Sequence, residues 1–355
     1  MKNKKLELVY VRAIICTSIV LTHILTSYTI QEATETVEYE YLYIIRNIFI
    51  FGVPCFLILS QLLVTARYDY IPYNFIRKRI MYVFIPYFFV GILYAYTMKY
   101  GSDESFIEIY KDAVIIGNWY GYFIIIFLFT ILLNLLFKRV PLKIFGNIWV
   151  LFSALIVQVV FFYVRNHYDW FQEFLIHDYP LNEHTFFLGW IFYYFLGGFI
   201  GYHYDNVIKF LEDYLVIVIA ASILAFVIFV MYFNHDYYTV QSFAGKLIPY
   251  NTMMFFLVLG IAIHCKTIAY SYVVFVSHFS YQIYLLHPLY LNSVYDVTRP
   301  FLDSTLAFIL ITLFVVQTSI IGFSIFVHTF SVTRILFGTR DFKYIFKEID
   351  AKYLS

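Results

Sequence analysis

Long apolar segments recur along the chain, separated by short polar connections. A membrane-spanning helix needs about 20 mainly apolar residues, because each residue advances about 1.5 Å and the hydrocarbon core is about 30 Å thick. Ten segments predict such crossings: residues 8–30, 41–64, 80–97, 120–137, 148–164, 185–202, 214–233, 248–264, 271–290 and 305–328. Segments 185–202 and 248–264 are short and glycine-interrupted, so they are the ones expected to be broken, merged or re-entrant.

This pattern predicts an all-α, polytopic membrane helix bundle that forms one domain over residues 1–355. The longest predicted outer loop, residues 165–184, has no room for an extramembrane domain. Composition agrees, because only 13% of residues are charged, against about 25% in a soluble domain. The net charge of +1 offers no basic surface for nucleic acid. Three scattered cysteines predict neither disulfides nor a metal site.

The distribution of Lys and Arg predicts the orientation, because positive charge is retained on the cytoplasmic side. Seventeen basic residues fall on one side: Lys2, Lys4, Lys5, Arg67, Arg77, Lys78, Arg79, Lys138, Arg139, Lys143, Lys209, Lys266, Arg334, Arg340, Lys343, Lys347 and Lys352. Five fall on the other: Lys99, Lys111, Arg165, Lys246 and Arg299. Both termini are therefore predicted to be cytoplasmic, in a multi-pass protein of the cell membrane.

Arg12 and His23 are ionisable residues inside the first apolar segment, where such groups are costly. Their spacing turns an α-helix to within about 20° of three full turns and separates them by about 16 Å along its axis. Both side chains are therefore predicted on one helix face. The alternative is that Arg12 reaches to the interface while His23 only hydrogen-bonds to a neighbouring helix.

A basic cluster, Arg77, Lys78 and Arg79, precedes the third segment. Cytoplasmic positive charge of this kind can serve topology alone. Arginine side chains also bind phosphates through two parallel hydrogen bonds, which suits a donor such as acyl-coenzyme A. Both interpretations remain open at this point.

Several motifs resemble those of the family-3 membrane acyltransferases, multi-pass proteins that acylate carbohydrates. Residues 280–287 are similar to the family signature Ser-Tyr-x-x-Tyr-Leu-x-His, and Arg12 and His23 match its arginine, ten residues, histidine motif. Residues 53–60 and 195–201 resemble two further helix segments of the family. Because the motifs occur in the family's order, the likeness covers nearly the whole chain.

The resemblance implies O-acyl transfer to a sugar, with His23 as the catalytic base. An imidazole with an ordinary pKa near 6.5 is partly neutral at working pH, so it can accept the proton of an attacking hydroxyl. Acyl-coenzyme A is the implied donor, bound by Arg12, Arg77 and Arg79. Tyr82 stands where the family's Arg-x-x-Arg motif has its second arginine.

Residues 5–26, 119–123 and 179–202 show a narrower likeness, to members of the family that serve synthesis of the biofilm polymer poly-β-1,6-N-acetylglucosamine. This implies acylation of that polymer, with succinyl-coenzyme A as the expected donor and the polymer-making membrane glycosyltransferase as the expected partner. The alternative is export of the polymer without chemistry. A conduit would need polar faces along several helices, whereas the polar residues here are concentrated in a few places.

Five aromatic residues are predicted near the outer interface, where they would stack on sugar rings: Trp119, Tyr120, Tyr122, Trp170 and Trp190. Interfacial Trp and Tyr also serve simply as membrane-belt residues. Ser280, Tyr284 and His287 are expected to hold helices together through buried hydrogen bonds.

Overall fold

The computed structural model describes residues 5–32, 40–72, 74–100, 102–137, 142–233, 240–265, 267–298 and 305–339. Within these ranges every regular element is helical. The α-helices are α1 (Leu6–Glu32), α2 (Glu40–Ile48), α3 (Gly52–Thr65), α4 (Phe75–Arg79), α5 (Ile85–Lys99), α6 (Phe106–Tyr110), α7 (Tyr122–Leu136), α8 (Ile148–His167), α9 (Asp169–Glu173), α10 (Ile191–Tyr202), α11 (Tyr204–Phe233), α12 (Ile248–His264), α13 (Tyr270–His278), α14 (Ser280–Thr298), α15 (Thr305–His328) and α16 (Ser331–Leu336). The predicted all-α bundle is confirmed.

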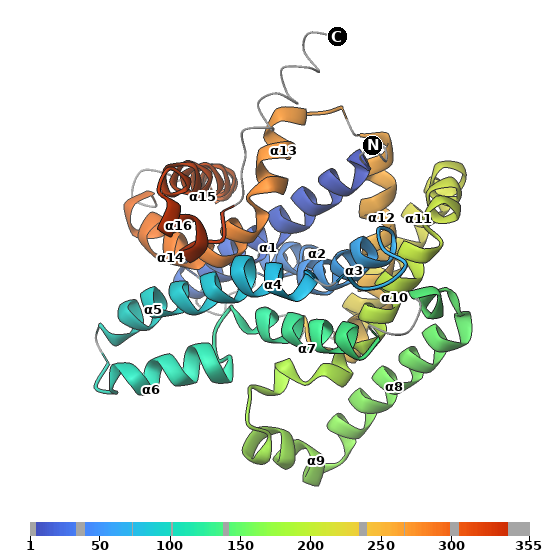
Figure 1. Cartoon of the computed structure of the whole chain (residues 1–355), viewed down its shortest axis with the longest axis horizontal. Coiled ribbons are helices and arrows are strands. Elements are labelled where there is room, and N and C mark those ends of the chain that lie inside the picture. Colours follow the sequence, from blue (N-terminus) through green and yellow to red (C-terminus); the bar gives the residue numbers. More distant parts are fainter. Residues whose placement is uncertain are drawn as a thin grey trace.

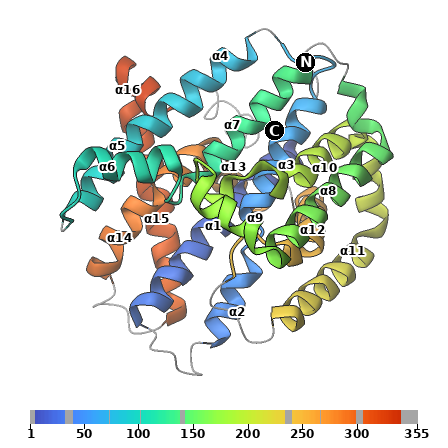
Figure 2. The same ribbon diagram turned by 90° about the horizontal axis from the view of Figure 1, so that it is seen from below.

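Helix α1 lies at the centre of the bundle. It contacts α2, α3, α12, α13, α14 and α15. In Figure 1 the helices α14, α15 and α16 lie on one side of α1, and α11 and α12 lie on the other; Figure 2 shows α8 and α11 together at one flank. Since α1 is apolar along its length yet contains Arg12 and His23, its central position places both residues inside the protein.

Seven helical stretches within the described residues are long and apolar enough to cross a membrane: Leu6–Tyr28, Tyr41–Thr65, Phe75–Lys99, Ile148–His167, Tyr204–Tyr232, Gly245–His264 and Leu306–His328. The protein is thus a multi-pass membrane protein. The sequence predicted ten crossings, and three of those segments behave differently. Segments 120–137 and 185–202 correspond to the shorter apolar helices Tyr122–Leu136 and Ile191–Tyr202.

The third exception is segment 271–290, which contains a break. Helix α13 ends at His278 and α14 begins at Ser280, with Phe279 between them outside helical geometry. Helix α14 continues past Pro288 to Thr298. An apolar run in the sequence does not reveal this break, because both helices bury apolar residues in the same core.

Helix α11 begins ten residues before the predicted crossing 214–233. Its backbone leaves helical geometry at Tyr214, where φ is −125° and ψ is 26°. The first part carries the charged residues Asp205, Lys209, Glu212 and Asp213, and the part after the kink is apolar. The kink therefore separates a polar helical segment from the apolar one.

Part of the charge pattern behind the predicted orientation lies outside the described residues. These positions are Lys2, Lys4, Lys138, Arg139, Lys266, Arg299, Arg340, Lys343, Lys347 and Lys352. The cytoplasmic location of both termini stays a prediction, which a reporter fused at Ser355 decides by its cytoplasmic or external signal.

Candidate active site

Two groups of cavities lie at different levels of α1. His23 lines a cavity of about 200 Å³, here named the His23 cavity. Arg12 lines a second cavity of about 200 Å³ and a third of about 940 Å³, named the Arg12 cavity and the basic cavity. Since the two residues are 11 positions apart in one helix, they lie about 16 Å apart along the axis of α1.

Two aromatic rings surround His23. The Tyr120 ring meets the imidazole edge-on with centroids 4.5 Å apart, and the His287 ring lies 4.9 Å away. Tyr120 also lines the His23 cavity. His23 is only half-buried, so its imidazole is held by the protein on one side while it remains accessible from the cavity.

The hydrogen bonds of His287 define its tautomer. Its Nδ1 lies 3.0 Å from the Ile283 carbonyl oxygen and 2.7 Å from that of Tyr284. Carbonyl oxygens only accept hydrogen bonds, so Nδ1 carries the proton and Nε2 has a lone pair. The Nε2 atom is buried with no hydrogen-bond partner among the described residues. A second imidazole with an unused acceptor therefore lies beside His23.

Arg46 of α2 is the main residue absent from the sequence-based site prediction. It lines the His23 cavity. Its guanidinium donates to Thr26 Oγ1 at 2.8 Å, Asn47 Oδ1 at 3.3 Å and the Val240 carbonyl oxygen at 3.2 Å. Because guanidinium has five N–H groups, these described contacts leave donors for a ligand. The available signal was an arginine inside the apolar segment 41–64, a position that is costly in a membrane.

Tyr120 and Tyr122 are the two predicted sugar-stacking residues that line the His23 cavity. The Trp119 ring packs against Tyr94 instead, with centroids 4.0 Å apart, and its indole N–H donates to Tyr87 Oη at 3.3 Å. Trp119 thus anchors the segment that carries both tyrosines.

The remaining two predicted stacking residues lie away from the cavity lining. Trp170 is 65% exposed on α9. Trp190 is fully buried, and its indole N–H donates to the His184 carbonyl oxygen at 2.8 Å. Its buried position fits a role in stabilising the fold rather than in contacting sugar.

Tyr284 and Ser280 connect α14 to neighbouring segments. The Tyr284 hydroxyl donates to the Tyr120 carbonyl oxygen at 2.8 Å. The Ser280 carbonyl oxygen lies 3.6 Å from Cys16 Sγ on α1. Tyr284 also lines the His23 cavity and Ser280 lines the Arg12 cavity, so both residues combine a structural contact with a place at a cavity wall.

The basic cavity carries a strong positive charge. The described residues that line it include five basic side chains and no carboxylate; the five are Arg12, Arg67, Lys78, Arg79 and Arg334. They come from α1, α4, α16 and the turn after α3. Such a concentration of guanidinium and ammonium groups suits a ligand with several phosphates.

The predicted basic cluster divides between this cavity and the surface. Lys78 and Arg79 line the basic cavity, whereas Arg77 is exposed and is not part of the described lining. Arg79 and Tyr82 also line the Arg12 cavity. Tyr82, which replaces an expected arginine, thus lies at the junction of the two cavities.

One aromatic pair separates the Arg12 cavity from the His23 cavity. Phe123 lines the first and Tyr284 the second, and their rings meet edge-on with centroids 5.9 Å apart. Phe56 adds a further ring 6.5 Å from Phe123. The two cavities are therefore adjacent at this pair of rings.

The match of the chain to a protein family adds chemistry to this geometry. A family model for an acyltransferase domain matches residues 6–326, which include both α1 motif residues and the α14 signature. The chain belongs to this acyltransferase family. A Staphylococcus aureus protein named "Probable poly-beta-1,6-N-acetyl-D-glucosamine export protein" is 40% identical over 344 residues, covering 97% of this chain and 98% of that protein. The Staphylococcus epidermidis protein of the same name is 41% identical over 349 residues, covering 98% of each. No solved structure matches the chain.

The family predicted from the α1 and α14 motifs is confirmed by this match. It supports acyl transfer as the type of reaction. The roles of individual residues, the donor and the acceptor are not fixed by it.

Proposed function

We propose that this protein transfers an acyl group from acyl-coenzyme A to a hydroxyl of poly-β-1,6-N-acetylglucosamine. The observation that carries the proposal is the arrangement along α1, with His23 and Arg46 in one cavity and five basic side chains in another. Family membership supports the reaction type, and the names of the relatives support the polymer. The polymer-making glycosyltransferase is the proposed neighbour in the membrane.

The donor would bind with its phosphates in the basic cavity. Arg79 and Lys78 would contact phosphate oxygens there, and Arg12 would contact the donor where the basic and Arg12 cavities meet. The acyl thioester would pass the Phe123–Tyr284 pair and enter the His23 cavity. This route uses the two cavities that share Arg12 and Arg79, and it leaves the nucleotide outside the apolar interior.

In the proposed step, His23 accepts the proton of a sugar hydroxyl while that oxygen forms a bond to the thioester carbonyl carbon. The carbonyl oxygen becomes negatively charged, and N–H groups of Arg46 stabilise this charge. When the tetrahedral intermediate collapses, the carbon–sulfur bond breaks and the protonated His23 returns its proton to the leaving thiolate. The products are a sugar ester and free coenzyme A.

Replacement of His23 by Gln tests this proposal. General-base catalysis contributes about 10²- to 10⁴-fold in rate, so ester per sugar residue on secreted polymer should fall nearly to zero while membrane abundance is retained. His264→Gln is a matched control, because His264 is exposed and bonds to Gly260 of its own helix. Undiminished ester in the His23 variant would contradict the proposal.

Export without chemistry gives a different outcome in the same experiment. If polymer from the unaltered protein carries no ester, and the His23 variant traps polymer inside the cell, the transport interpretation replaces ours. The acyl group is identified by the mass of the acid that mild alkali releases from the polymer, with succinate as the expected product.

A further inference from the structure

A second histidine, His184, lines the His23 cavity and is supplied by a loop. It lies in the short helical turn Glu183–Thr185, which precedes α10. Its ring lies 6.1 Å from that of Tyr122 and 5.4 Å from that of Phe243, and both of these residues also line the cavity. The sequence-based site prediction does not include this histidine.

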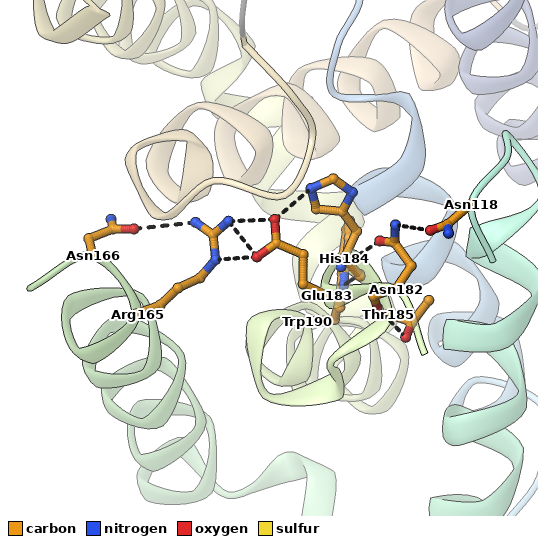
Figure 3. Close-up of polar contacts among 8 residues, drawn as sticks. All are labelled: Asn118, Arg165, Asn166, Asn182, Glu183, His184, Thr185 and Trp190. Atoms are coloured by element: carbon orange, nitrogen blue, oxygen red, sulfur yellow. Dashed lines mark hydrogen bonds and ion pairs between the residues drawn. The ribbon is translucent and has the colours of Figure 1, made fainter. Parts of the chain in front are cut away.

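The backbone of His184 is fixed on both sides. Its N–H donates to Asn182 Oδ1 at 2.8 Å, and its carbonyl oxygen accepts from Trp190 Nε1 at 2.8 Å (Figure 3). The indole that makes the second bond is fully buried. The position of this loop residue is therefore set by the protein core.

An ion pair lies next to the His184 side chain. Arg165 of α8 donates to both carboxylate oxygens of Glu183, at 2.9 Å to Oε1 and 2.8 Å to Oε2. Glu183 Oε1 in turn lies 3.6 Å from His184 Nε2, and Figure 3 shows the three side chains in a row. The arginine thus holds the carboxylate beside the imidazole, at a distance at which the two interact electrostatically.

The charge state of His184 follows from the same surroundings. Burial lowers its pKa below the ordinary 6.5, the Arg165 charge lowers it further, and the Glu183 carboxylate raises it. Burial is the largest effect, so the imidazole is neutral at pH 7. The nearby carboxylate favours the proton on Nε2, which leaves Nδ1 as a hydrogen-bond acceptor.

The loop of His184 is also tied to the segment that carries the cavity tyrosines. The Asn182 N–H donates to the Ile116 carbonyl oxygen at 2.8 Å, and Asn182 Nδ2 donates to Asn118 Oδ1 at 2.7 Å. Tyr120 and Tyr122 follow directly. Two loops, an imidazole and two phenol rings are thus arranged around one end of the His23 cavity before any ligand arrives, which lowers the cost of binding.

We propose that His184 binds the acceptor sugar, taking a hydrogen bond from a hydroxyl or acetamido N–H of an N-acetylglucosamine unit while Tyr122 contacts the ring face. Arg165 and Glu183 act through His184 as positioning residues. This inference rests on the proposed function. The inference goes beyond the proposed function because it assigns acceptor recognition, rather than proton transfer, to a site that includes a loop.

The experiment measures acyl transfer from acyl-coenzyme A to β-1,6-linked N-acetylglucosamine oligosaccharides with the full chain in detergent. Loss of one neutral hydrogen bond corresponds to about 3- to 10-fold in affinity. His184→Ala should raise the acceptor KM by about this factor and leave the donor KM unchanged. His184→Asn places an oxygen near the former Nδ1 and should recover most of the affinity.

His177→Ala is the matched control, since His177 is an exposed histidine of the same outer segment, and its acceptor KM should equal that of the unaltered protein. Glu183→Gln should raise the acceptor KM less than His184→Ala does. This variant provides the test of the inference if the alanine variant fails to accumulate. An unchanged acceptor KM in both the alanine and glutamine variants, or equal rises in donor and acceptor KM, would overturn the inference. Failure of the unaltered protein to acylate the oligosaccharide would instead overturn the proposed function.

Discussion

At the scale of single residues, His287 compensates for a proline. Pro288 lies inside α14 and has no N–H, so the Tyr284 carbonyl oxygen lacks its usual helical donor. His287 Nδ1 donates to this oxygen at 2.7 Å. The bond lies within one helix, whereas the sequence-based interpretation expected contacts between helices. The buried histidine thus supplies the hydrogen bond that the proline cannot make, and at the same time it packs beside His23.

Removing this donor should destabilise the protein. His287→Ala leaves a buried carbonyl oxygen without a partner, which costs about 1–3 kcal/mol, and thermal unfolding in detergent should show a lower midpoint. His287→Asn keeps a donor of similar reach and should lose less. An alanine variant that unfolds at the original temperature would show that the hydrogen bond to Tyr284 contributes nothing measurable.

At the scale of helices, α3 and α10 pack closely because glycines face the contact. A Cβ atom added at Gly197 would lie 2.2 Å from the Ile58 carbonyl oxygen, and one added at Gly201 would lie 2.6 Å from that of Leu62. Both obstacles are backbone atoms, which cannot rotate away. Small residues allow this approach in membrane bundles, where dispersion contacts replace the hydrophobic effect as the force between helices.

Gly197→Ala should therefore separate α3 from α10. Overpacking of this kind costs about 1–3 kcal/mol, which should appear as a lower unfolding midpoint and reduced membrane abundance. Gly322→Ala on α15 is the matched control, because an added Cβ meets nothing within 4 Å there and alanine favours the helix by about 1 kcal/mol. Equal stability of the two variants would contradict the proposed close contact.

At the scale of the whole molecule, the proposed donor and acceptor functions lie at different levels of α1. The basic side chains of the basic cavity come from α1, α4, α16 and the turn after α3. The His23 cavity is lined by α1, α2, α3, α14 and the segments that lead into α7, α10 and α12. In the proposed mechanism, reaction at His23 therefore requires the donor to extend from the basic cavity into the bundle. A substitution in the basic cavity should alter donor binding without altering recognition of the sugar.

Arg79→Gln provides this test. Arg77→Gln is its matched control, because Arg77 is a nearby arginine on the exposed surface. Loss of a charge-assisted hydrogen bond, about 1.5–3 kcal/mol, corresponds to about a 10- to 100-fold rise in donor KM. Arg77→Gln should change it far less, and neither variant should change the acceptor KM. Equal effects of the two substitutions would show that general surface charge, rather than the cavity, governs donor binding.

The sequence by itself determined the class of the protein and the two site residues that lie on α1. Apolar length and helical periodicity are local properties, so they predicted the helical membrane bundle and placed Arg12 and His23 on one face of α1, a face that does meet cavities at both levels. Motif likeness in α1 and α14 indicated the family that the match over residues 6–326 confirms.

Only the tertiary structure decided which residues far away in the sequence lie near Arg12 and His23. Arg46 and His184 enter the His23 cavity because α2 packs against α1 and the loop of His184 is joined to α8 by the Arg165–Glu183 ion pair. Lys78 rather than Arg77 enters the basic cavity because the two side chains leave α4 in different directions. Similarly, segment 271–290 divides at Phe279 although its apolar sequence is continuous. Side-chain direction and helix breaks depend on packing between elements far apart in the chain, and that information is not present in any local run of residues.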